Sequence, residues 1–198
     1  MRFFSILFLL IPTIAIIAQN DNYWQQEVNY TIDVELNDQT NYLYGHIKIE
    51  YINNSPQVLD RIYFHLWPNA YKDKKSDFAK QKIRDNDDEF YFADKEKLGF
   101  IDSIDFSIDG KDMQWSYLNE NDEIAVLNLS EPLLTGSKVT VETPFRVKLP
   151  YVFSRLGHIG NEYQISQWYP KPAVYDNNGW HYFSYLDIRD ISIGNNRI

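Results

Sequence analysis

Cysteine is absent from this sequence of 198 residues, which excludes disulfide frameworks, thiol catalysis and cysteine-ligated zinc or iron–sulfur sites. Histidine is scarce, and the chain has only four: His46, His65, His158 and His181. Basic side chains are also few, because 19 Lys and Arg face 28 Asp and Glu and leave a net charge of −9. An acidic protein repels phosphate backbones, so general binding to nucleic acid is not expected.

Aromatic residues, in contrast, are abundant, with 15 Tyr, 12 Phe and 5 Trp. This content excludes an intrinsically disordered chain, which would be poor in aromatic residues. The length suits one domain with a hydrophobic core of its own. No internal repeat or low-complexity segment interrupts it.

The first residues have the pattern of a secretory signal peptide. Arg2 supplies a positive start, residues 3–17 are almost wholly apolar, and Ala18 precedes a polar run. The apolar run is shorter than the roughly 20 residues that span a bilayer, so an uncleaved anchor is the weaker alternative. We therefore expect cleavage after Ala18 and export to a bacterial periplasm or to the extracellular space, with no transmembrane segment left.

Alternation of apolar and polar residues predicts a series of strands. Residues 62–67 are apolar on both faces, which predicts a central strand ended by Pro68. Asp109-Gly110 is a hairpin signal. Together these patterns predict an all-β fold, an antiparallel β-sandwich of two layered sheets. The expected strands cover residues 28–36, 43–51, 62–67, 101–108, 113–118, 124–129 and 139–149.

Residues 70–98 interrupt this series with a strongly charged stretch. Ser76 can cap a short helix that runs to about Arg84. An acidic patch follows, and a solvated surface is its expected role. A calcium site is the alternative, but the patch lacks the spaced alternation and the turn glycine of a calcium loop. The acidic residues are Asp85, Asp87, Asp88 and Glu89.

No recognised catalytic string is present. The chain has no His-Glu-x-x-His, no Gly-x-Ser-x-Gly and no glycine-rich phosphate loop. His46 is expected on the solvent face of a strand, and His65 is expected to be a hydrogen-bonded structural residue. His158 and His181 lie in an irregular segment that begins at Tyr151, where loops could line a cleft. No catalytic residue and no metal ligand is therefore assigned.

Residues 163–180 combine uncharged amides with many aromatic rings. Such a combination can bind sugars or peptide ends, because amides donate and accept hydrogen bonds while rings exclude water. Equally, the rings can form a packed corner that holds a loop to the sandwich. The residues of a binding platform would be Trp168, Tyr169, Tyr175 and Trp180.

Most of the sequence resembles a known protein family. Residues 24–186 are similar to the N-terminal β-domain of the aminopeptidase N-type zinc metallopeptidases, the gluzincins, in their exported bacterial form. Residues 28–51 resemble the opening hairpin of that domain, and residues 62–66 resemble its next strand. Residues 131–149 resemble its Pro-Leu-x-x-Gly strand entry. The sharpest likeness is the run Gln-Trp-Tyr-Pro-Lys-Pro-Ala-Val-Tyr-Asp within residues 164–176.

The resemblance implies a domain without chemistry of its own. In the family, the zinc ligands and the general base lie in a following thermolysin-like domain, and none of their strings occurs here. Zinc is thus implied for a full-length member rather than for this chain. A Gln or Glu of the N-terminal domain helps to anchor the free amine of the substrate; Gln164 is the first candidate for this role and Gln167 the second.

The domain prediction is then a signal peptide at 1–18, an aminopeptidase N-like β-domain at 19–187 and a truncated tail at 188–198. We expect a substrate-anchoring domain that is inactive alone, with a catalytic domain and a peptide N-terminus as its partners. The alternative is a secreted carbohydrate- or protein-binding β-sandwich. A third hypothesis is an independent hydrolase that uses carboxylates with His158 or His181. No sequence motif supports it.

Overall fold

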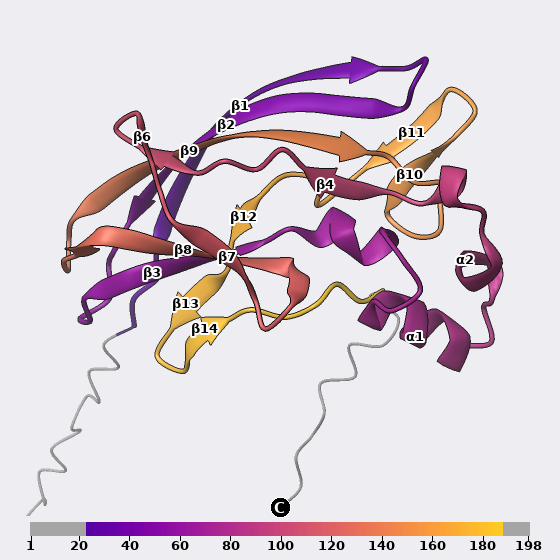
Figure 1. Ribbon diagram of the computed structural model, residues 1–198. Helices are drawn as coiled ribbons and strands as arrows, with labels where there is room; N and C mark the ends of the chain where they lie inside the picture. Colours follow the sequence, from indigo (N-terminus) through magenta and orange to yellow (C-terminus); the bar gives the residue numbers. More distant parts are fainter. Residues whose placement is uncertain (1–22, 188–198) are drawn as a thin grey trace, which may run out of the picture.

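The computed structural model describes residues 23–187 and shows two main antiparallel sheets packed together, with few short helices (Figure 1). The predicted all-β sandwich is therefore confirmed. The first sheet has the order β1-β2-β9-β5-β6, with β4 also paired to β9. Its strands are β1 (Glu27–Asn37), β2 (Tyr42–Ile52), β4 (Phe100–Asp102), β5 (Ser107–Ile108), β6 (Lys111–Asp112) and β9 (Lys138–Lys148).

The second sheet has the order β12-β3-β8-β7, and two short ribbons, β10–β11 and β13–β14, complete the strands. β3 lies inside this sheet, as its apolar pattern predicts. The strands of the second sheet are β3 (Leu59–His65), β7 (Trp115–Leu118), β8 (Asn121–Leu133) and β12 (Lys171–Pro172). The ribbons consist of β10 (Leu156–Ile159), β11 (Glu162–Ile165), β13 (Val174–Asp176) and β14 (Gly179–His181).

The core lies between the two sheets and follows from the period-two patterns. Alternate residues of each long strand point inward, where burial of apolar area is favourable. Ile47 and Ile49 of β2 and Val141 of β9 are fully buried from one side, and Ile62 and Phe64 of β3 meet them from the other. Whether a strand residue faces the core or the solvent therefore depends on whether its number is odd or even within that strand.

Three strand predictions need correction. The strand predicted over 124–129 is longer, because β8 covers Asn121–Leu133. The strand predicted over 62–67 ends at His65, because the 3-10 helix η1 (Trp67–Tyr71) follows it. Pro68 lies in the first turn of η1, where its missing N–H is not needed. The strand predicted over 101–108 is split into β4 and β5. Ser103 adopts φ +60°, and the Asp105 amide donates to Thr143 Oγ1 at 2.9 Å instead of to a neighbouring strand.

The charged excursion between the strands contains the predicted helix. α1 spans Asp77–Arg84, and the Ser76 hydroxyl accepts a hydrogen bond from the Ala79 amide at 3.1 Å. α2 (Glu89–Phe92) and η2 (Lys95–Lys97) follow. Phe78 and Phe90 are fully buried, so this excursion packs onto one end of the sandwich (Figure 1).

Residues 182–187 run back over α1 and β8 and are held by polar contacts. The Tyr185 amide donates to Glu123 Oε2 at 2.6 Å. Gln81 binds both backbone groups of Asp187, at 2.7 and 3.1 Å. The predicted signal peptide and tail lie outside the described residues. Within 23–187, no helix has the length and apolarity needed to cross a membrane.

Candidate functional site

A cleft of about 350 Å³ lies where one edge of the first sheet meets one edge of the second. β1 is the edge strand of the first sheet and β12 the edge strand of the second. Val28 and Tyr30 of β1 face the cleft because even-numbered residues of β1 point inward. We call this cleft the edge cleft. Its lining consists of residues 23–26, Val28, Tyr30, Tyr51 and residues 171–176.

Tyrosine hydroxyls set the polarity of the edge cleft. Tyr51 is only 1% exposed, and its hydroxyl is enclosed without a hydrogen-bond partner among the described residues. Burial raises the pKa of Tyr51, and the neighbouring phenols of Tyr175 and Tyr30 raise it further. The pKa of Tyr30 is raised by burial and by Tyr169. These hydroxyls are therefore neutral donors at any physiological pH.

The rim of the edge cleft carries one charge of each sign, Lys171 and Asp176. Asp176 Oδ1 lies 2.8 Å from His181 Nε2 and accepts the Asn178 amide at 2.7 Å. The hydrogen bond from His181 lowers the pKa of the Asp176 carboxyl. The contact between His181 and Asp176 joins the two strands of the β13–β14 ribbon.

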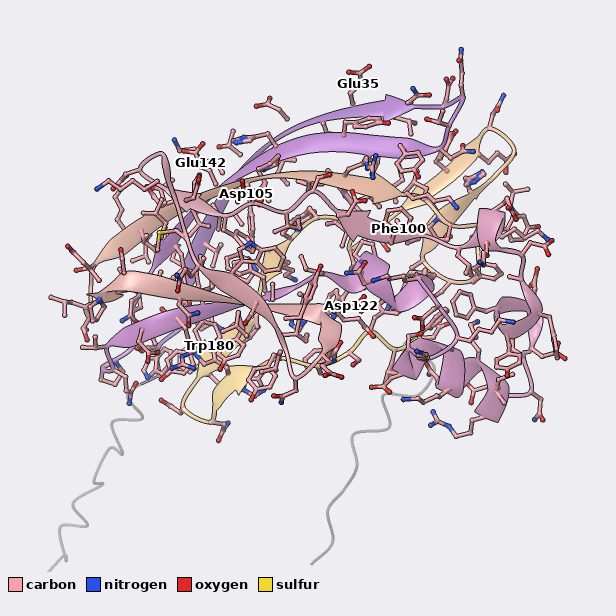
Figure 2. The ribbon with its side chains drawn as sticks, in the orientation of Figure 1. Glu35, Phe100, Asp105, Asp122, Glu142 and Trp180 are labelled. Carbon is pink, nitrogen blue, oxygen red and sulfur yellow. The ribbon has the colours of Figure 1, made fainter. Side chains whose placement is uncertain are left out.

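The four rings proposed as a platform do not form one flat surface. Trp168 packs on the ring of Phe145, and Tyr169 is inclined to Trp168 by 79°. Tyr175 and Trp180 belong to the β13–β14 ribbon, where their centroids lie 4.8 Å apart. All four rings are half-buried against the core, and Trp180 is seen beside β3 in Figure 2. This arrangement fits the packed-corner reading better than an exposed sugar platform.

The two candidate glutamines differ in their surroundings. Gln164 is exposed on β11, opposite Gly157 of β10. Gln167 follows that ribbon with φ +55°, a conformation that non-glycine residues rarely adopt. Its Oε1 is enclosed and has no hydrogen-bond partner among residues 23–187, whereas the residue as a whole is half-buried. The strained backbone and the unpaired acceptor thus coincide at Gln167.

The histidines lie apart. His46 is exposed on the outer face of β2, as expected, with Nε2 3.8 Å from Glu142. His65 is buried and stacks on Trp67 at 4.3 Å, and its Nδ1 has no partner in the described chain. Backbone groups of His181 and Phe183 act on the His65 ring and oppose the effect of burial on its pKa. His158 lies in β10, 5.8 Å from the Tyr163 ring.

The described residues do not fit a zinc site or the alternative calcium site. Across residues 23–187, no three His, Asp or Glu side chains are grouped so that they could hold a metal ion. In the acidic patch, Asp87 Oδ2 lies 3.0 Å from Lys82 Nζ, so a cation from the protein already faces that carboxylate. No step of a reaction can therefore be assigned to a metal held by these residues.

Sequence reasoning missed the edge cleft, because its lining comes from three separate stretches and no motif joins them. The one available signal was the alternation of Val28, Tyr30 and Ile32 in a strand preceded by Trp24. In the comparison with known proteins, no family model and no curated protein matches the chain.

Proposed function

We propose that this chain is a non-catalytic, exported β-domain of the aminopeptidase N type, which holds the amino terminus of a peptide for a partner catalytic domain. Any zinc of such an enzyme belongs to that partner. The observation that carries the proposal is Gln167, where an enclosed acceptor without a donor sits on a backbone with φ +55°. The surrounding run, Gln-Trp-Tyr-Pro, is also the sharpest part of the family resemblance.

Both features of Gln167 cost free energy. An L-residue in the left-handed region is less favourable by about 1–2 kcal/mol, and an unsatisfied buried polar atom costs about 1–3 kcal/mol. Backbone strain of this kind clusters at functional sites. A peptide ammonium offers three donors to such an acceptor. Gln167 is half-buried, and the proposed role requires a rotamer that turns its Oε1 towards the peptide. The amide would then orient the peptide without taking part in the chemistry.

Binding of a short peptide to the purified chain tests this role. We expect a tripeptide with a free amino terminus to bind more tightly than its acetylated form in isothermal titration calorimetry. Gln167→Ala should abolish that difference. Gln164→Ala is the matched control, since Gln164 is an exposed amide three residues away, and should leave the difference intact. Equal affinities for the free and acetylated peptides in the unmodified chain would sink the proposal.

Two further measurements address the family assignment. The purified chain supplied with zinc should release no product from an aminopeptidase substrate; turnover would contradict a non-catalytic role. The genomic sequence beyond codon 198, read in three frames, should encode a His-Glu-x-x-His string followed by a further Glu. If no such frame exists, the assignment to a zinc aminopeptidase fails, and a stand-alone secreted binding sandwich becomes the better reading.

A further inference from the structure

β1 is a long edge strand with one unpaired side. Its 11 residues pair with β2 along their whole length, and no strand in the described part of the chain lies on its other side. Every second residue of such an edge presents its backbone N–H and C=O groups outward, as a template for another strand. Natural edges are commonly blocked by charged side chains, above all lysine, and by proline or bulges. β1 has the sequence EVNYTIDVELN, with no lysine, no proline and an unbroken register with β2. Its charged residues are all acidic, so only a strand that is not itself acidic is expected to pair with it.

The inner row of β1 is apolar and only partly covered. Val28, Tyr30, Ile32, Val34 and Leu36 share this face. Tyr30 is 36% exposed, Val34 48% and Leu36 38%. The row begins at the edge cleft, where the unpartnered Tyr51 hydroxyl lies in the cleft lining. The inward side chains of a strand added to β1 would therefore lie beside this apolar row. At one end they would lie at the opening of the edge cleft, whose lining contains the Tyr51 hydroxyl.

The outer row of β1 is acidic. Glu27, Asp33 and Glu35 occupy odd positions and share the outer face, and none forms an ion pair with a described residue. Figure 2 shows Glu35 and Glu142 on this same face, but Glu142 lies on β9 and is paired with Lys48 at 3.1 Å. The unpaired negative charge of the face is thus concentrated at its free edge.

This charge pattern distinguishes between two possible binding partners of the free edge of β1, a second copy of this chain and a basic strand. A second copy of this chain, paired through β1, would place acidic side chains beside acidic side chains, which is unfavourable in a sheet. A strand with basic residues on its outer face would pair with them. We propose that the free edge of β1 binds an extended peptide segment whose residues alternate between apolar and basic, by adding it to the first sheet as a further strand. This site does not involve Gln167 and does not rest on the proposed function.

The probe is a seven-residue peptide with lysine at alternate positions and valine or tyrosine between them, acetylated and amidated. The acetyl group removes any contribution from amino-terminal anchoring. We expect measurable binding at low salt that weakens as salt is raised, since exposed charge pairs are screened. The same peptide with glutamate in place of lysine should not bind. Equal binding of the two peptides, or binding of neither at millimolar concentration, would overturn the proposal.

Backbone pairing is tested by N-methylation of the lysine peptide at every second residue, in either register. Methylation in the register that faces β1 should abolish binding, and methylation in the other register should not. Hydrogen exchange should slow at β1 amides in the presence of the unmodified peptide and stay unchanged at β9. Insensitivity to methylation in both registers, or self-association of the chain through β1 in sedimentation, would contradict strand addition.

Two matched double variants test the acidic row without altering the backbone. Asp33→Asn with Glu35→Gln removes two charges at the edge, and Glu50→Gln with Glu142→Gln removes two from inner strands of the same face. Each exposed charge pair is worth at most roughly fivefold in affinity, so the edge variant should bind the lysine peptide roughly tenfold more weakly at low salt. The inner variant should lose much less. Equal losses would show that only the net charge matters, and would refute the site.

Discussion

Two buried titratable groups with opposite behaviour lie next to each other at the end of β3. Burial lowers the pKa of His65 to about 4, and Lys171 lowers it further, while carbonyl groups of His181 and Phe183 oppose the shift. Burial raises the pKa of Glu123 to about 7. The Leu66 amide donates to the Glu123 carbonyl at 2.7 Å, so the two residues belong to one packed region.

The charges around Glu123 act in both directions. Asp77 and Asp122 raise its pKa, whereas Lys80 and the hydrogen bond from the Tyr185 amide lower it. Burial remains the largest cause of the shift. The Glu123 side chain must nevertheless accept that amide at 2.6 Å, which a glutamine oxygen can also do. Glu123→Gln therefore removes the titration and keeps the hydrogen bond.

The sign of each effect on stability follows from linkage. For His65 the folded pKa lies below the ordinary value of 6.5, so its contribution is complete above pH 6.5 and is lost as pH falls towards 4. For Glu123 the folded pKa lies above the ordinary value of 4.5, so its contribution is complete below pH 4.5 and is lost as pH rises through 7. At about 1.4 kcal/mol per pH unit, each effect amounts to about 3 kcal/mol.

We therefore expect the free energy of unfolding to vary little between pH 4.5 and 6.5, because the two slopes oppose each other. Other carboxyl groups with a shifted pKa, such as that of Asp102, have a lowered pKa, so they change the free energy of unfolding only below this pH window. In Glu123→Gln, the free energy of unfolding should rise by about 3 kcal/mol across the same window. Urea unfolding followed by tryptophan fluorescence at pH 4.5, 5.5, 6.5 and 7.5 measures this.

His65→Gln should show the reverse slope, with stability falling from pH 4.5 to 7. If Glu123→Gln and the unmodified chain gave parallel profiles, Glu123 would titrate alike in the folded and unfolded states, and the reasoning from burial would be refuted. A parallel profile for His65→Gln would refute the same argument for His65.

Two further substitutions test the packing. Tyr51→Phe removes a hydroxyl without a partner and should raise the free energy of unfolding by about 1 kcal/mol or more, whereas Tyr163→Phe removes a 2.7 Å bond to Asn41 and should lower it by about 1 kcal/mol. Destabilisation of both variants alike in urea titrations would contradict this contrast. Gly45→Ala would place its Cβ 2.2 Å from Cζ of the buried Phe145 ring, and should cost about 1–3 kcal/mol of overpacking. Wild-type stability of Gly45→Ala by thermal unfolding would show that the ring can move.

The sequence predicts the long strands well because one physical rule, alternation of buried and exposed faces, acts along their whole length. β1, β2 and β9 agree with the predicted ranges to within about one residue at each end, a normal difference for element boundaries. β8 is the exception, since it extends beyond the predicted 124–129 to Asn121–Leu133. The Asp109-Gly110 hairpin is confirmed by φ values of +51° and +72°. The Ser76 cap is confirmed by its hydrogen bond.

The failures occur where distant contacts override the local pattern. Ile104, Phe106 and Ile108 alternate as a strand should, and all pack on the core, yet the backbone between β4 and β5 is bent by the hydrogen bond of Asp105 to Thr143, 38 residues away. The edge cleft has the same origin. Its lining residues meet only because the edges of two sheets lie together, and no local spacing encodes that meeting.

The unpaired polar atoms are not scattered over the fold. Gln167 and His158 belong to residues 151–187. Three more such atoms belong to side chains that pack on rings of the same segment: Tyr51 on Trp180, His65 on Phe183 and Tyr71 on Tyr185. The long strands thus satisfy their backbone groups through regular pairing, and the enclosed atoms without partners gather where the irregular segment covers the sandwich. Since each such atom costs about 1–3 kcal/mol, a segment that served only as cover would be stabilised by apolar replacements at these positions. Of these atoms, the Tyr51 hydroxyl lies in the edge cleft and Gln167 Oε1 lies in the Gln-Trp-Tyr-Pro run. The peptide-binding contrast between Gln167→Ala and Gln164→Ala distinguishes a binding role at Gln167 from simple cover.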